Sequence, residues 1–470
     1  MRKPKPMFVT SRVQVACFPS HMKSLFRSFF AIVFCSFLAF GENPKADARF
    51  KADLLVIVAH PDDETEIGAY LARAIFDEKK RVAVVFGTRG NAGGNAEGQE
   101  QAGALAAVRE IEAREALAHF GVLHVWFLNG LDTPSQNVLE SLETWNHGDS
   151  LGRMVRLIRL TRPSVVATWL PDSVAGENHG DHQAAGVIAT EAFDLAGNPA
   201  AFAEQLAAPR DREGVNNLTE GLRPWQPQKI YYFSDAAHTD FLKDKGPSYS
   251  ATDASPTRNV SYAQLAAEEC SYHLTQGDTG QMAKAALAKN DLHYFNEPVN
   301  FIFGKSHVES SVTGDLFDGV RPGGIAYKEP PAFTPQTLAA PAIELGGPWH
   351  FYRNFWQAHG LEHLAKLLGP EIMAQRASFL TIPVRIENPG DAGIDVNLSV
   401  EIPDGWIFIR PAPAHVSVGA NDHQTVMFGV KTPESGVKGW KTIAIDARSK
   451  QQSLGRIQIR VEIDSAAMPQ

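Results

Sequence analysis

Short apolar runs alternate with helical stretches between residues 54 and 170, and this alternation restricts the fold more than any other feature of the sequence. The expected strands are 54–59, 82–86, 122–128 and 164–170, and the first is apolar throughout, as a strand covered on both faces should be. Strands that alternate with helices at this spacing predict an α/β fold with right-handed crossovers. We therefore expect a doubly wound, mostly parallel, Rossmann-like sheet.

Ionisable side chains follow the first and the fourth of these expected strands. The two groups are His60, Asp62, Asp63 and Glu64 after the first strand, and Asp172, Glu177, His179, Asp181 and His182 after the fourth. In doubly wound sheets, ligands bind at the carboxyl ends of the strands. Both groups are therefore expected at the same edge of the sheet.

Imidazole and carboxylate groups at two strand ends are the ligand types of a zinc-like site. A catalytic zinc keeps three protein ligands and one open position, and its bound water can have a pKa near ~7. A neighbouring carboxylate can then act as general base, and a histidine can stabilise the oxyanion. Each group alone has a plainer interpretation, because His60-Pro61 can be a turn and Asp62-Asp63-Glu64 can cap a helix. Their coincidence at one edge favours a functional site.

The sequences AHPDDE at 59–64 and HGDH at 179–182 occur in this order, and the first follows an apolar run. This pair of motifs resembles the LmbE-like or PIG-L-like superfamily of zinc-dependent N-acyl deacetylases, and the resemblance extends over residues 52–320. Members deacetylate N-acetylglucosamine conjugates, such as those in mycothiol, bacillithiol and glycosylphosphatidylinositol synthesis. The resemblance implies the same reaction class for this chain.

The resemblance also implies a role for individual residues of the two motifs. His60, Asp63 and His182 would bind the metal, which is Zn²⁺ or alternatively Fe²⁺. Asp62 would act as general base, and His179 would polarise the amide and stabilise the oxyanion. Spacing alone does not distinguish Asp62 from Asp63, so this division comes from the resemblance.

Three further residues, Arg89, Asp181 and His273, are candidates for substrate binding. Arg89 lies in the glycine-rich segment 87–95, which lacks both the dinucleotide spacing and a Gly-Lys-Ser/Thr ending. In the resembled family this loop lines the pocket, and a flexible surface loop is the alternative. His273 belongs to a His-x-x-Gln element similar to one near the active-site rim of larger members, and a helix C-terminal cap is the alternative.

Three other positions carry expectations of their own. Arg109 and Glu112 resemble an Arg-x-x-Glu element of the family, but their spacing on an expected helix favours a surface ion pair. At Gly180 many relatives have proline, so we expect a looser turn there without the loss of a functional group.

Residues 1–48 are expected to be an export signal and not part of the fold. Basic residues precede an apolar run at 29–40, and residues 46–48 have the small-x-small pattern of a cleavage site. The run is shorter than the about 20 residues that span a bilayer, and Met22 is an alternative start. We expect an exported protein, periplasmic or extracellular, that is cleaved near Ala48 and contacts a membrane only through an uncleaved leader.

The remainder of the chain is acidic and almost free of cysteine. The formal net charge is −9, and the leader holds more basic than acidic residues, so its removal makes the rest more negative. This balance argues against nucleic acid as a partner. Only Cys270 lies beyond the leader, so an intrachain disulfide is excluded there and a metal site must use histidines and carboxylates.

A change in composition marks the end of the catalytic part, which we expect to span 49–327. Residues 328–373 are expected to form a linker, with a proline-rich stretch first and a short aromatic and helical stretch at 349–368. Residues 374–466 contain short alternating runs separated by turn signals, which predict an all-β sandwich. The turn at 388–390 and the segment 403–406 resemble immunoglobulin-like modules of secreted carbohydrate-active enzymes. Such a module can bind glycan, pack against the catalytic domain or act as a spacer, and the sequence does not choose among these roles.

Together these features predict a secreted, zinc-dependent hydrolase in which metal-bound water attacks an N-acyl amide. The acyl group is taken to be acetyl, on an amino sugar or related amide that is a small molecule or a glycan, and the oligomeric state stays open. One alternative is a catalytically silent carbohydrate-binding protein that retains the pocket. The other is an esterase or phosphoesterase, for which two metals about 3.5–4 Å apart would be expected.

Overall fold

A computed structural model describes residues 47–172, 179–206, 221–236, 240–277, 279–335, 338–367, 369–435 and 439–463. The expected leader lies outside these residues, apart from its last two positions, and so does Glu177 of the second ionisable group. Within the described residues, no helix is both long enough and apolar enough to cross a membrane.

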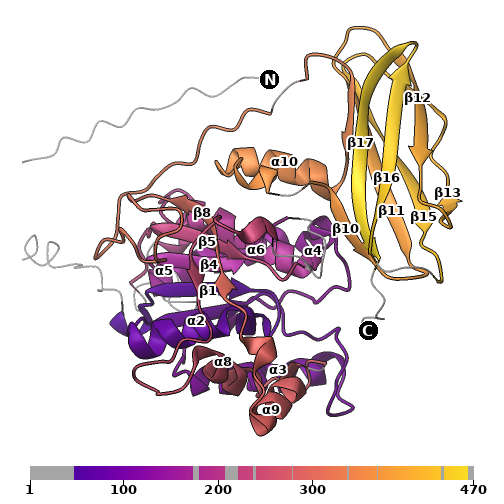
Figure 1. Cartoon of the computed structure of the whole chain (residues 1–470). Helices are drawn as coiled ribbons and strands as arrows, with labels where there is room; N and C mark the ends of the chain where they lie inside the picture. Colours follow the sequence, from indigo (N-terminus) through magenta and orange to yellow (C-terminus); the bar gives the residue numbers. More distant parts are fainter. Residues whose placement is uncertain are drawn as a thin grey trace, which may run out of the picture.

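The first part of the chain forms a six-stranded sheet with the order β3-β2-β1-β4-β5-β8 (Figure 1). Neighbouring strands are parallel except for β8, which runs antiparallel to β5. The strands are β1 (Leu54–Val58), β2 (Val82–Phe86), β3 (Val125–Phe127), β4 (Val165–Trp169), β5 (Lys229–Phe233) and β8 (Ile302–Ser306). The predicted doubly wound, mostly parallel fold is confirmed.

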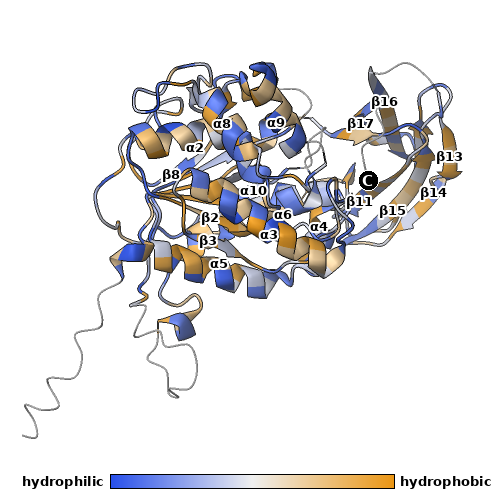
Figure 2. Ribbon diagram, turned by 90° about the horizontal axis from the view of Figure 1, so that it is seen from below, coloured by the Kyte–Doolittle hydropathy of each residue, from blue (hydrophilic) through white to orange (hydrophobic). Residues whose placement is uncertain are grey.

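Helices cover both faces of this sheet. One layer contains α2 (Gly68–Ala72), α3 (Ala102–His119), α8 (Tyr262–Cys270) and α9 (Thr279–Lys289), and the other contains α4 (Val138–Thr144), α5 (His147–Thr161) and α6 (Gly180–Leu195). Figure 2 shows hydrophilic and hydrophobic bands along these helices, the pattern of helices that bury one side and expose the other. A short pair of strands, β6 (Ser248–Tyr249) and β7 (Val299–Asn300), lies outside the main sheet.

The sheet interior is strongly apolar, and this fixes where the polar chemistry can lie. Every residue of β1, β2, β4 and β5 is buried. Burying a Val, Leu or Ile side chain contributes about 1.5–3 kcal/mol, and Lys229 at the start of β5 is the one Lys, Arg, His, Asp or Glu residue in these four strands. The candidate site residues His60, Asp62 and Asp63 accordingly follow the end of β1.

The C-terminal region is a β-sandwich of two sheets, with the orders β10-β17-β16-β12-β14 and β13-β15-β11-β9. Its strands are β9 (Ala342–Leu345), β10 (Glu371–Ala374), β11 (Phe379–Asn388), β12 (Ile394–Glu401), β13 (Ile407–Arg410), β14 (His415–Val418), β15 (Asp422–Lys431), β16 (Gly439–Ser449) and β17 (Gln452–Ile463). Apolar side chains from both sheets form a core of their own. The predicted all-β module is confirmed.

The range expected to be a linker contains regular structure. β9 completes the edge of one sandwich sheet by pairing with β11, and β10 pairs with β17. Between them, α10 (Pro348–Ala358) buries Tyr352 and two neighbouring aromatic side chains in the core of the α/β part. The expected helical stretch is confirmed by α10, whereas β9 and β10 are strands of four residues that leave little periodic signal. This segment therefore connects the two parts through packed structure (Figure 1).

Candidate metal centre and active site

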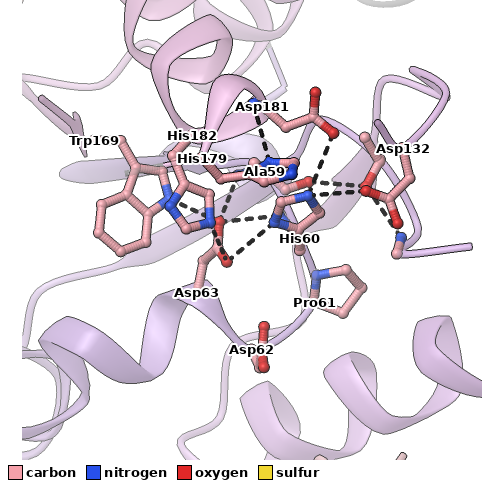
Figure 3. A network of polar contacts seen from close by, with 12 residues as sticks. Ala59, His60, Pro61, Asp62, Asp63, Asp132, Trp169, His179, Asp181 and His182 are labelled. Atoms are coloured by element: carbon pink, nitrogen blue, oxygen red, sulfur yellow. Dashed lines mark hydrogen bonds and ion pairs between the residues drawn. The ribbon is translucent and has the colours of Figure 1, made fainter. Parts of the chain in front are cut away.

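The segment after β1 and the first turn of α6 bring three side chains with metal-ligand chemistry together (Figure 3). Donor atoms of His60, Asp63 and His182 all lie within 4.8 Å of one another. His60 Nδ1 is 3.5 Å and His182 Nε2 is 3.3 Å from Asp63 Oδ1. Ligands held about 2.1 Å from a tetrahedral ion lie roughly 3.4 Å apart. The spacing therefore fits a single divalent metal ion.

Asp63 is oriented by three hydrogen bonds to one of its two oxygens. Its Oδ2 accepts the backbone N–H groups of Ala59, at 2.8 Å, and of His60, at 3.0 Å, and the indole N–H of Trp169, at 2.7 Å. Burial alone would raise the pKa of Asp63, but His182 and His60 hold it well below its usual range. The carboxylate is thus charged, and Oδ1 is directed at the two imidazoles.

Each metal-binding imidazole has a carboxylate on its other nitrogen. His60 Nε2 lies 3.1 Å from Asp132 Oδ1 and 3.4 Å from Asp181 Oδ2, and His182 Nδ1 lies 3.3 Å from Asp235 Oδ2. Carboxylates in this position fix the tautomer and ring orientation of a metal-binding histidine. They leave His60 Nδ1 and His182 Nε2 facing the centre.

The ring of His182 is also held by an aromatic contact. The indole of Trp169, the last residue of β4, stacks on the imidazole with 4.3 Å between ring centroids and 5° between planes. The same indole donates to Asp63. Trp169 therefore positions two of the three ligands at once.

Asp62 lies beside this donor set and lines the same cavity. Its φ of 103° is left-handed backbone, a conformation that Asp and Asn adopt more readily than most residues. The Asp62 N–H donates to Glu64 Oε2 at 3.0 Å, which helps to hold this turn. Burial, and then the neighbouring Asp63 carboxylate, raise the pKa of Asp62 to about 7. Such a carboxyl group can take up and release a proton near neutral pH.

His179 is poised as a hydrogen-bond donor. Its Nδ1 accepts the backbone N–H of Asp181 at 3.2 Å, capping the N-terminus of α6. Burial, followed by the positive field of His60, lowers the pKa of His179 to about 4, so the ring is neutral. A neutral imidazole that accepts at Nδ1 carries its proton on Nε2. The Nε2–H of this cavity-lining residue is therefore free to donate to a bound group.

Two other groups of ionisable side chains have metal-like spacing in the described part of the chain. His60, His179 and Asp181 form one, but it shares His60 with the first group and uses the nitrogen that faces Asp132. Glu64, Glu269 and His273 form the second, and all three are fully buried and do not line the cavity. Of these three groups, that of His60, Asp63 and His182 is the one that lines an open cavity and whose two imidazoles each have a carboxylate beside the other ring nitrogen.

The three predicted substrate contacts do not lie on the cavity wall. Arg89 bonds Glu110 on α3, at 2.6 Å, and Asn129. Asp181 is fully buried and accepts from Thr133, which makes it a support for His60. His273 is fully buried against Glu64, with 3.1 Å between Nε2 and Oε1.

The expected surface ion pair of Arg109 and Glu112 is wrong, because both side chains are buried. The Arg109 guanidinium donates to the carbonyls of Gly90 at 2.5 Å, Gly94 at 2.6 Å and Thr275 at 3.2 Å. Glu112 accepts from the hydroxyl of Thr275 at 2.7 Å. Spacing on the helix identified the two residues as neighbours but could not show that loops cover this side of α3.

Sequence reasoning missed Asp132, Asp235 and Trp169. Asp132 follows β3, Asp235 follows β5, and Trp169 ends β4, so all three lie at the carboxyl edge of the sheet. The rule that selected His60 and His182 applied equally to these strand ends. Single residues without a motif gave no further signal.

Gly180 is fixed in its turn, contrary to the expected loosening. Its N–H donates to the carbonyl of Ser135 at 2.7 Å, and a Cβ built there would lie 2.6 Å from the same oxygen. The loop that bears Thr133 and Gln136 is thereby attached to the start of α6. Glycine is the residue that this approach requires.

We expect Gly180→Pro to lower the free energy of unfolding by about 1–3 kcal/mol, because the variant loses this hydrogen bond and crowds the Ser135 carbonyl. Urea denaturation followed by circular dichroism measures the change. Gly148→Ala is the control, because nothing lies within 4 Å of its Cβ position. Equal midpoints for Gly180→Pro and wild type would contradict the role given to this contact.

Comparisons with known proteins find a family match within the α/β part. A family model described as "PIG-L: GlcNAc-PI de-N-acetylase" matches residues 55–193. Among curated proteins, a 1D-myo-inositol 2-acetamido-2-deoxy-alpha-D-glucopyranoside deacetylase 1 of Catenulispora acidiphila is 28% identical over 183 residues, which cover 36% of this chain and 56% of the relative. The corresponding deacetylase of Geodermatophilus obscurus is 33% identical over 165 residues, with 31% of this chain and 54% of the relative covered.

The chain thus spans about half the length of these curated relatives. Among solved structures, N,N'-diacetylchitobiose deacetylase from Pyrococcus horikoshii aligns with 59% of this chain and 91% of its own, at 18% identity and a TM-score of 0.37. The family match covers both strand-end motifs and all three donors of the metal centre. Residues 55–193 of this chain are therefore a PIG-L domain.

Proposed function

We propose that this protein is a metal-dependent N-deacetylase that hydrolyses the acetamide of an N-acetylglucosamine-type substrate. The observation that carries the proposal is the donor set of His60, Asp63 and His182, which shares one cavity with a carboxyl group and a neutral histidine. The matched family and the curated relatives bear the names of deacetylases of such substrates, which supports the same reaction class.

Zn²⁺ is the metal that we propose for this site, with Fe²⁺ as the alternative. Two imidazole nitrogens and one carboxylate oxygen suit either ion, and three protein ligands leave a position open. When bound, such an ion polarises the amide carbonyl and lowers the pKa of a coordinated water to about 7.

Asp62 would transfer the protons of the reaction, and His179 would stabilise the negative charge that forms on the substrate. Asp62, with a pKa near neutrality, would accept a proton from the attacking water and pass it to the leaving amine. His179 would donate from Nε2 to the oxyanion that forms on the amide oxygen. Asp132 and Asp235 would keep the metal-binding imidazoles in the required tautomer.

The two alternative functions fit the site less well. A silent carbohydrate-binding protein has no need of an ionisable base and an oxyanion donor beside a complete ligand set. A two-metal hydrolase needs a second ligand set about 3.5–4 Å from the first ion and open to substrate. The buried group of Glu64, Glu269 and His273 is the remaining candidate among the described residues, and it does not line the cavity.

The reaction is tested by measuring acetate and free amine from N-acetylglucosamine and its disaccharide. We expect both products in equal amounts, their loss after treatment with a chelator, and recovery when Zn²⁺ is added back. A folded, metal-loaded protein that releases neither product would overturn the proposal.

Export through residues 1–48 is also proposed, on the basis of the sequence alone. The protein recovered from a cell envelope or culture medium is expected to begin near Arg49. N-terminal sequencing checks this, and an intact chain beginning at Met1 or Met22 in the cytoplasm would contradict it.

A further inference from the structure

The cavity around the metal centre has an unusual balance of charge. It has a volume of about 1110 Å³, at the upper end of the sizes typical for small-molecule sites. Six carboxyl groups line it: Asp62, Asp63, Glu66, Asp132, Asp235 and Glu297. Among its described lining residues there is one arginine and no lysine. The wall is therefore strongly acidic.

The single arginine offers little to an anionic ligand. Arg109 is 4% exposed, and its guanidinium donates to the carbonyls of Gly90, Gly94 and Thr275. Recognition of phosphate or carboxylate normally uses the free fork of an arginine or a lysine ammonium.

A bound divalent ion does not reverse this balance. The ion and Arg109 together would supply three positive charges against six carboxyl groups. Asp63 and the two imidazoles would hold this ion. Glu297 is an exposed residue of the wall with no ion pair among the described contacts. A second anion in the cavity would thus face the uncompensated carboxylate of Glu297.

The rim adds a surface suited to a sugar ring. The short 3₁₀ turn His293–Phe295 places Tyr294 and Phe295 on the cavity wall, and Tyr294 is 63% exposed. Exposed aromatic faces contact the apolar faces of sugar rings, and Glu297 can accept hydrogen bonds from hydroxyl or ammonium groups. The volume of the cavity, the aromatic residues at its rim and its acidic wall all favour a sugar without a negative charge.

We propose that this cavity selects N-acetylated amino sugars that are otherwise uncharged or positively charged, and that it rejects those carrying a phosphate or carboxylate. This inference rests on the proposed deacetylase function and narrows its substrate class. An anionic substrate that faces carboxylates in a binding site is repelled, so it binds more weakly than a neutral substrate and its kcat/KM falls. The positive class includes oligomers of glucosamine in which some rings already have a free amine.

The test compares sugars that differ only in charge: N-acetylglucosamine, its 6-phosphate, its 1-phosphate and its 6-amino-6-deoxy derivative. We expect kcat/KM for amine release from the acetamide of both phosphates to be at least tenfold below the parent sugar, and that of the amino derivative to equal or exceed it. Raising ionic strength from about 0.02 M to about 0.5 M should shrink the difference, because salt screens exposed charges. Values for either phosphate within threefold of the parent would overturn the inference, whereas no amine from any sugar would instead refute the proposed function.

A charge reversal on the wall provides a second test. Glu297→Lys should raise the ratio of kcat/KM for the phosphates to that for the parent sugar by at least threefold, and Glu309→Lys, an exposed site off the cavity wall, should leave the ratio unchanged. Calorimetric binding of the same sugars to Asp62→Asn gives a readout without turnover, and the same order of affinities is expected. An unchanged ratio in Glu297→Lys, or tighter binding of the phosphates, would contradict the proposal.

Discussion

Replacing Asp62 with asparagine is expected to lower kcat for amine release by about 10²–10⁴-fold while the metal stays bound. Asparagine cannot accept a proton, and Asp62 is not among the three grouped donors. Asparagine tolerates the φ of 103° at this position better than alanine does, so the turn should be preserved. Activity and metal content are measured on the same preparation.

Asp149→Asn is the matched control, because this half-exposed carboxylate lies on α5 and off the cavity wall. It should keep both activity and metal. If Asp62→Asn retained more than a tenth of wild-type kcat, another group would have to be the base. If it lost the metal, Asp62 would be a ligand, and the division between Asp62 and Asp63 would be reversed.

Replacing His273 with alanine is expected to lower the free energy of unfolding by about 3–5 kcal/mol. His273, Glu64 and Glu269 are each fully buried, and His273 Nε2 is 3.1 Å from Glu64 Oε1 and 3.9 Å from Glu269 Oε1. The variant leaves two buried carboxyl groups facing each other without a positive partner. Urea denaturation of both proteins measures the difference.

Glu269→Gln is the control, because it changes the same buried group without removing the positive partner of the two carboxyl groups. Burial raises the pKa of Glu269 to about 7, so glutamine resembles its protonated form and should cost less than about 1 kcal/mol. A loss below about 1 kcal/mol in His273→Ala would show that the buried pair with Glu64 contributes little.

Particular residues show how far the sequence could be interpreted. The uninterrupted apolar run of β1 predicted a buried parallel strand, and the position of the ionisable groups after β1 and β4 predicted the edge where they meet. The end of an apolar strand can be located from the sequence, and ligands bind at the carboxyl ends of the strands in sheets of this kind. The meeting of the two ionisable groups followed from it, whereas the choice of His60, Asp63 and His182 as the metal-binding residues came from the family resemblance.

What could not be predicted depends on contacts between distant segments. His273 and Glu64 are 209 positions apart, and nothing local indicates that one covers the other. Arg109 presents the same problem, because its partners Gly90 and Thr275 come from two loops that close over α3. β9 was hidden because an edge strand of four residues leaves almost no periodic signal.

The most direct test of the account is metal content per chain, measured by elemental analysis on wild type, Asp62→Asn and His182→Ala purified in parallel. The site built on His60, Asp63 and His182 predicts one ion, one ion and none, respectively, with amine release from N-acetylglucosamine in the wild type alone. Two ions per wild-type chain, or an ion retained in His182→Ala with unchanged affinity, would contradict a single centre held by these three residues.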